Sequence, residues 1–274
     1  MSNPAAPAEQ LLELAAEFRR HNDSMTHLWE RAPRASAAFA EEAKTAGLLA
    51  LSATRVIRML EEEHPPNTPP IRAVRARAVQ LREMALNCNR HLESASKLLA
   101  AAIPDNPLRG GENVKPLQED EEIARVRLDL ARNLTALGPS DAVAAAEIYV
   151  AERRRQGIFP LHRPPALSPS QDAALRAVAR GQVATHKGYT GHGDEIPESA
   201  IGLNGAHVTI ATIRSLESRS LVTREPSPFL YHSTHVFLTP DGRRGLASSF
   251  GLSRPPTTTA RPSTRPTASR SATR

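Results

Sequence analysis

Apolar side chains recur at alternating steps of four and three along much of the first 157 residues. This rhythm predicts long helices that pack through narrow apolar stripes. One helix is predicted from about Pro33 to Glu63, with a stripe of Phe39, Ala43, Ala46, Ala50, Ala53, Ile57 and Leu60. A second begins at Thr68-Pro69, a cap followed by proline, and runs to Ala102, with a stripe of Val74, Ala78, Leu81, Ala85, Cys88, Leu92, Ala95 and Leu99. The short Pro65-Pro66-Asn67 linker predicts that these two helices pack antiparallel.

Three further helices complete the prediction for residues 1–157. They run near Ala8–His21, from about Pro116 to Leu137 with acidic residues in the first turn, and through Val143–Arg155 after a Pro139-Ser140 cap. The stripes mix Leu and Ile with many alanines, so they have few bulky anchors. We therefore predict an antiparallel helical bundle, or an elongated hairpin array that completes its core by forming a homodimer.

The periodicity stops at residues 158–167, IFPLHRPPAL, which hold three prolines in ten residues. We interpret this segment as a domain linker. Because proline-rich connections are semi-rigid, it predicts that a C-terminal domain at 168–250 is held away from the bundle.

The C-terminal domain has a different pattern. Thr209 can cap a helix in which Ile210, Ile213 and Leu216 form one apolar stripe. Val222 to Arg224 continue as a strand, Glu225-Pro226-Ser227-Pro228 interrupts it, and Val236 and Leu238 lie two apart on a return strand. Thr239-Pro240-Asp241 then starts a helix that reaches about Ser249. The order is a helix, a two-stranded wing and a short helix.

This segment resembles the DNA-binding domain of MarR-type winged-helix regulators. The resemblance rests on Val208–Glu217, Arg219-Ser220-Leu221-Val222 and Leu238–Gly242, with Leu167–Ala179 similar to the first helix of that domain. It implies a winged helix-turn-helix fold, a recognition helix at 209–220 in the major groove of double-stranded DNA, and a homodimer that reads two half-sites. The chain departs from the family in two places: Leu230 and His232 stand where the wing usually has an acid and an arginine, and Ser220 replaces the usual glycine.

Charge separates two interpretations of this domain. Residues 1–150 hold 18 Lys and Arg against 21 Asp and Glu, residues 151–165 hold four against one, and residues 166–250 hold eight against seven. The last 24 residues hold five arginines and no acid, and we predict that this Pro/Ser/Thr/Arg tail (251–274) is disordered. DNA binders usually concentrate positive charge on the reading face. Either the domain binds DNA with help from flanking basic segments, or it has turned to protein contacts.

Other chemistry is sparse. Cys88 falls on an apolar stripe, which predicts a packed thiol rather than a nucleophile. Gly188, Gly191 and Gly193 lack the Gly-Lys-Ser/Thr ending of a phosphate loop, so we predict a flexible turn. Histidines 186, 192, 207, 232 and 235 crowd the C-terminal domain without a Cys pair or an i, i+4 spacing, so no metal is expected. We predict no enzyme activity and no cofactor, and no effector can be named.

The start, MSNPAAPAEQ, has no signal-peptide pattern and no apolar run approaches 18 residues, which predicts a cytoplasmic protein. The sequence thus predicts a mainly α fold with a small β-wing and a DNA-binding transcriptional regulator. The alternative is a winged-helix adaptor without sequence-specific DNA binding, docking through Phe229 and Tyr231. The predicted DNA contacts are short or basic side chains, with Arg224 or His232 replacing the wing arginine: Thr209, Ala211, Thr212, Arg214, Ser215, Ser218, Arg219, Arg224 and His232.

Overall fold

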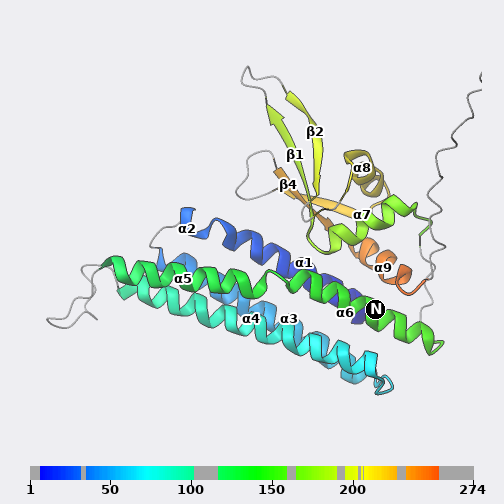
Figure 1. Cartoon of the computed structure of the whole chain (residues 1–274), viewed down its shortest axis with the longest axis horizontal. Coiled ribbons are helices and arrows are strands. Elements are labelled where there is room, and N and C mark those ends of the chain that lie inside the picture. The colour runs from blue at the N-terminus through cyan, green and yellow to red at the C-terminus, as the bar shows by residue number, and fades with distance from the viewer. Residues whose placement is uncertain are drawn as a thin grey trace, which may run out of the picture.

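The computed structural model describes residues 7–31, 35–101, 117–158, 165–189, 195–202, 205, 207–226 and 233–252. This part of the chain is mainly helical and contains one small antiparallel sheet of four strands. Long helices lie side by side along the length of the molecule, and the sheet with three shorter helices covers one side of them (Figure 1).

The bundle is formed by the helices α1 (Pro7–Thr26), α2 (Leu28–Arg31), α3 (Ser36–Glu62), α4 (Pro69–Ala101), α5 (Leu117–Thr135) and α6 (Gly138–Arg155). Helices α3 and α4 form the antiparallel hairpin that the sequence predicts. Asn89 Nδ2 donates to the Ala43 carbonyl oxygen at 2.8 Å, and Ser96 Oγ donates to the Ser36 carbonyl oxygen at 2.8 Å, so α4 runs opposite to α3. All the predicted stripe positions are buried except Ile57, which is partly buried.

Helix α4 is long enough to pack against both α5 and α6, while α1 packs on α3 and α6. A close approach fixes the crossing of α1 and α6. A Cβ atom at Gly138 would lie 2.3 Å from the ring of Phe18, which is fully buried. Helix α6 begins at this glycine rather than after a Ser140 cap, because Pro139 is accommodated in its first turn and Leu137 is the N-cap.

The C-terminal unit comprises α7 (Pro169–Ala179), β1 (Val183–Tyr189), β2 (Glu195–Gly202), α8 (Ile210–Ser218), β3 (Val222–Pro226), β4 (Ser233–Leu238) and α9 (Pro240–Ser249). The strand order is β2-β1-β4-β3, and all neighbours are antiparallel. Helices α7, α8 and α9 begin where the sequence predicts, each with a side-chain N-cap, at Ser168, Thr209 and Thr239.

Two predictions for this unit were wrong. The sheet has four strands rather than two, because β1 and β2 occupy the region interpreted as a flexible turn. Gly188 lies within β1, at a break in the β1–β2 register, whereas Gly191 and Gly193 lie outside the described residues. The strand β2 also precedes α8 where a helix-turn-helix would have a helix. The ladder of edge strand β3 with β4 continues as far as Pro226, and the rest of the predicted break, Ser227-Pro228, lies outside the described residues.

The C-terminal unit is not held away from the bundle, contrary to the prediction from the proline-rich linker. Helices α7 and α9 pack on α1 and α6 (Figure 1). A single apolar cluster runs through both parts and includes Leu14, Tyr149, Leu175, Leu246 and Phe250, each at most 1% exposed. The linker sets the path of the chain, but burial of apolar surface decides where the unit sits.

Within the described ranges, none of the helices combines the length and the apolarity that crossing a lipid bilayer requires.

Candidate nucleic-acid interface

Helix α8 is fixed to the rest of the unit by one apolar stripe and two well-formed ends. Ile213 and Leu216 are completely buried. At the start, Thr209 Oγ1 accepts a hydrogen bond from the Thr212 backbone N–H at 3.2 Å. Helix α8 packs on α7, β2 and β3, and it lies on the side of the unit that faces away from the bundle (Figure 1). Its outer face is therefore open to a large partner.

The end of α8 shows how the chain accommodates Ser220 in place of glycine. Ser220 adopts a left-handed conformation with φ of 56°. The Leu221 N–H donates to the Leu216 carbonyl at 3.0 Å and the Ser220 N–H donates to the Glu217 carbonyl at 2.8 Å, as in a Schellman motif. Helix α9 packs directly against this turn, and only a glycine fits at 242, because a Cβ there would lie 1.9 Å from the Leu221 carbonyl oxygen.

The predicted contact residues on α8 share one face, but they differ in exposure. Thr209, Ala211, Arg214, Ser218 and Arg219 are exposed, whereas Thr212 and Ser215 are half-buried. Ser215 Oγ accepts a hydrogen bond from Gln171 Nε2 of α7 at 2.9 Å. The exposed set is short or basic, which is the shape and charge that close approach to DNA requires.

Two of the three arginines at this face are paired with one carboxylate. Glu198 of β2 accepts hydrogen bonds from Arg214, at 3.0 Å, and from Arg224. Arg224 is also 2.8 Å from Glu217, and its side chain is only 18% exposed. Burial alone would raise the pKa of Glu198, but the hydrogen bonds and charges of the two arginines outweigh it and lower the pKa. Glu198 therefore stays ionised and neutralises part of the face.

Arg219 differs from its two neighbours. Its guanidinium donates to the Ala166 carbonyl oxygen at 3.0 Å and lies 3.4 Å from Gln171 Oε1. Both partners are neutral oxygens, and among the described residues no carboxylate forms an ion pair with Arg219. Arg219 thus keeps its full positive charge for an incoming anion.

The other predicted basic elements are used within the protein or lie outside the described residues. Arg154 donates to the carbonyl oxygens of Phe250 and Ser248, at 2.7 and 2.5 Å, and so closes the end of α9. Arg153 lies 3.6 Å from Glu63, and Arg155 pairs with Glu152 at 2.8 Å. The three arginines at 153–155 are therefore engaged in contacts within the protein. His232, Phe229, Tyr231 and the tail 253–274 lie outside the described residues.

A second polar cluster joins the C-terminal unit to α1. Arg19 donates to His235 Nδ1 at 3.1 Å and pairs with Asp23 at 3.0 Å, and His235 Nδ1 is 3.3 Å from Asp23. Burial raises the pKa of Asp23 to about 6 despite the neighbouring Arg19 charge. Burial and the same charge lower the pKa of His235 to about 4. At neutral pH the cluster therefore contains an ionised carboxylate, a neutral imidazole and a guanidinium.

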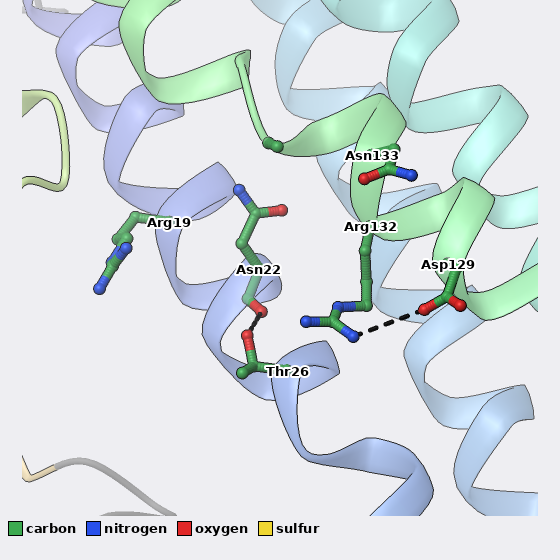
Figure 2. A pocket seen from close by; sticks show the side chains of 7 residues that line it. Arg19, Asn22, Thr26, Asp129, Arg132 and Asn133 are labelled. Carbon is green, nitrogen blue, oxygen red and sulfur yellow. Dashed lines mark hydrogen bonds and ion pairs between the residues drawn. The ribbon is translucent and has the colours of Figure 1, made fainter. Parts of the chain in front are cut away.

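Further pairs extend this junction along α1. Arg20 pairs with Glu225 at 2.8 Å and lies over the Phe237 ring, 4.5 Å from its centroid. Arg243 pairs with Glu13 at 2.6 Å. Beside the junction, a polar cleft of about 470 Å³ between α1 and α5 is lined by Arg19, Asn22, Thr26, Asp129, Arg132, Asn133 and Ala136 (Figure 2).

The histidines of the C-terminal unit do not form a metal site among the described residues. His186 Nδ1 lies 2.9 Å from Ser233 Oγ, and His235 faces Arg19 and Asp23. No group of three or more His, Cys, Asp or Glu side chains within the described ranges is arranged around a common metal position. Cys88 is a buried free thiol, as its place on the apolar stripe predicts.

Comparison of the chain with protein-family models, with curated proteins and with solved structures finds no match. The geometry must therefore carry the functional argument alone. The residue that sequence reasoning missed is Glu198, because β2 itself was missed. The available signal was the single acid between Ile196 and Ile201, in a segment whose glycines favoured a turn.

Proposed function

We propose that this protein is a DNA-binding regulator of transcription, whose C-terminal unit is a winged helix that places α8 in the major groove. One observation supports the proposal above the others. The unit has the order helix, two strands, helix, two strands, helix, and α8 packs on α7, β2 and β3 with its short, basic face exposed. In this proposal β2 takes the place of the helix that precedes a recognition helix in a helix-turn-helix.

The exposed residues divide into two roles in this proposal. Arg219, which has only neutral partners, makes the first contact with phosphate or a base edge. Arg214 follows by exchanging Glu198 for the DNA, while Thr209, Ala211 and Ser218 allow the backbone of α8 to come close. Arg224 stays mostly covered and supports Glu198 and Glu217 rather than entering the minor groove.

The proposal includes a homodimer, since two-fold symmetry is what matches a protein to paired half-sites. Exposed Leu48 and Leu51 on α3, at 64% and 62%, offer an apolar contact on the bundle. If they form the interface, replacing both with aspartate halves the mass measured by light scattering. The same change at Leu137, which is 66% exposed at the turn before α6, serves as the control and leaves the mass unchanged.

Fluorescence anisotropy with labelled random duplex DNA over a range of salt tests DNA binding. We expect the affinity of the full chain to fall steeply as salt rises. Arg219→Ala should weaken binding by about 1–3 kcal/mol and flatten the logarithmic salt dependence by about one. The control is Arg58→Ala, an exposed arginine of α3 on the bundle. Equal losses in both variants, or none in Arg219→Ala, would remove α8 from the interface.

A second candidate function is an adaptor that binds another protein through the same unit. The observation that favours it is the pairing of Arg214 and Arg224 with Glu198 and Glu217, which leaves little net charge on the face. Under this alternative neither the full chain nor a chain lacking 253–274 binds duplex DNA at low salt. A partner captured by the wild type would then be lost on Phe229→Ala.

A further inference from the structure

Three side chains that can bind a metal, an imidazole, a thioether and a thiol, meet in the core of the bundle. His21 and Met25, one turn apart on α1, face Cys88 of α4. The Cys88 Sγ atom is 3.3 Å from His21 Nε2 and 3.9 Å from Met25 Sδ. Cys88 and Met25 are fully buried and His21 is 2% exposed. Met25 contributes a thioether, whereas His21 and Cys88 belong to the residue types that bind metals more often.

The other ring nitrogen of His21 faces a carboxylate, to which it makes no hydrogen bond in the structure. Its Nδ1 atom lies 3.3 Å from Glu42 Oε2 of α3, and Ser24 Oγ donates to the same oxygen at 2.7 Å. This arrangement favours the tautomer in which Nδ1 carries the proton and Nε2 has its lone pair directed at Cys88. A carboxylate behind the distal ring nitrogen is the usual support of a metal-binding histidine.

We propose that His21 Nε2, Met25 Sδ and Cys88 Sγ bind one copper(I) ion. Thiolate and thioether sulfurs select copper(I) over harder cations, and imidazole is an accepted partner. The three atoms lie within an apolar cluster that includes Phe39, Leu92 and Leu128.

The two distances from Cys88 Sγ agree with a metal shared by Cys88 and each of the other ligands. With metal–nitrogen and metal–sulfur bonds of about 2.0–2.3 Å, the two measured separations correspond to angles at the metal of roughly 100° and 115°. Binding replaces the S–H bond by a sulfur–copper bond, and the thiol proton leaves to solvent, so that one proton is released per ion.

A route to the site lies beside His21. A small cleft of about 120 Å³ between α1 and α3 is lined by Glu17, His21, Thr45, Leu48, Leu49 and Ser52. His21 therefore belongs both to the cleft and to the buried cluster. An ion that enters here meets the edge of the imidazole before it reaches the two sulfurs.

The test is competition for copper(I), kept reduced with ascorbate under nitrogen, between the full chain and the coloured chelator bathocuproine disulfonate. We expect the wild type to withdraw one equivalent and to release one proton. Met25→Leu, which nearly preserves the volume, should weaken binding at least tenfold, and Cys88→Ala should abolish it. Glu42→Gln should weaken it 10- to 100-fold, since it removes only the support of His21. Met59→Leu on α3 is the matched control and should bind as the wild type does.

Circular dichroism of each variant serves as the control for folding: only a variant that keeps the helical content of the wild type counts in the comparison of copper binding. The proposal is overturned if folded wild type withdraws no copper from the chelator. It is equally overturned if the Met25→Leu/Cys88→Ala double variant still binds one equivalent, or if the wild type binds zinc(II) stoichiometrically and copper(I) not at all.

Discussion

Replacing Asp23 with asparagine should stabilise the protein at neutral pH, although the change removes one partner of an ion pair. The Asp23 side chain is 15% exposed, and burial raises its pKa from 3.8 to about 6 in the folded protein. The charge and hydrogen bond of Arg19 act in the opposite direction and do not restore the ordinary value. At pH 7.5 the folded protein therefore holds a carboxylate that has lost more hydration than Arg19 returns.

The size of the effect follows from the pKa shift. Because the pKa of Asp23 is higher in the folded protein, its protonated carboxyl stabilises the fold. This stabilisation is fully present below pH 3.8 and is lost as the pH rises through about 6. The difference of about two pH units corresponds to roughly 3 kcal/mol. Asparagine has nearly the shape of the protonated carboxyl and never ionises. Asp23→Asn should therefore raise the free energy of unfolding by up to about 3 kcal/mol at pH 7.5 and by almost nothing at pH 4.

His235 has the opposite pH dependence. Its pKa is lowered from 6.5 to about 4, so its contribution is present above pH 6.5 and is lost as the pH falls through about 4. In the wild type the two contributions oppose each other between pH 4 and 6.5. His235→Gln leaves only that of Asp23, so the stability of this variant relative to the wild type should increase as the pH falls through that range.

Urea unfolding followed by far-ultraviolet circular dichroism, repeated from pH 4 to pH 7.5, measures these differences. Asp129→Asn on α5 is the control, because that carboxylate is 59% exposed and its replacement should change stability by less than about 0.5 kcal/mol. A lower stability of Asp23→Asn than of the wild type at pH 7.5 would refute the reasoning, since the Arg19 pair would then outweigh the cost of burial.

Three further changes test other parts of the structure. Glu198→Gln frees Arg214 and removes one of the two carboxylates paired with Arg224. Duplex affinity at low salt should therefore rise about tenfold and its salt dependence should steepen, whereas Glu93→Gln on α4 changes neither in the anisotropy assay. Ser220→Gly removes the cost of a left-handed serine and should add about 0.5–1 kcal/mol in urea unfolding, and a loss of stability would contradict the strain assigned to that turn. Gly138→Ala places a methyl group against Phe18 and should cost about 1–3 kcal/mol, and a neutral result would mean that α1 and α6 separate without penalty.

Much of the bundle could be predicted from the sequence, because its helices are amphipathic over many turns. The stripe positions of α4, from Val74 to Leu99, are all buried as predicted. The caps at Ser168, Thr209 and Thr239 were equally visible, since each signal is local. Short-range patterns determine where such helices start and which face they bury.

The strands β1 and β2 could not be found in this way. Their segment carries glycines and histidines with little alternation, and it becomes a sheet by pairing β1 with β4, whose residues come about 50 positions later. The ion pairs of Glu198 depend on that pairing, so the sequence could not predict them either. The position of the C-terminal unit was likewise decided by α1, a helix at the opposite end of the described chain.

The ion pair of Arg20 with Glu225 joins residues 205 positions apart, and the core that α1 shares with α9 spans a still larger separation. During synthesis, the α3–α4 hairpin can close as soon as it leaves the ribosome, because its partners are neighbours in the chain. The part of the apolar face of α1 that α6 and α9 cover must wait until those helices have been made, and in that interval it is exposed to chaperones and to other copies. Any shortening of the chain before α9 would leave the part of α1 that α9 covers permanently exposed, so loss of the last described helix should cause aggregation through the first one.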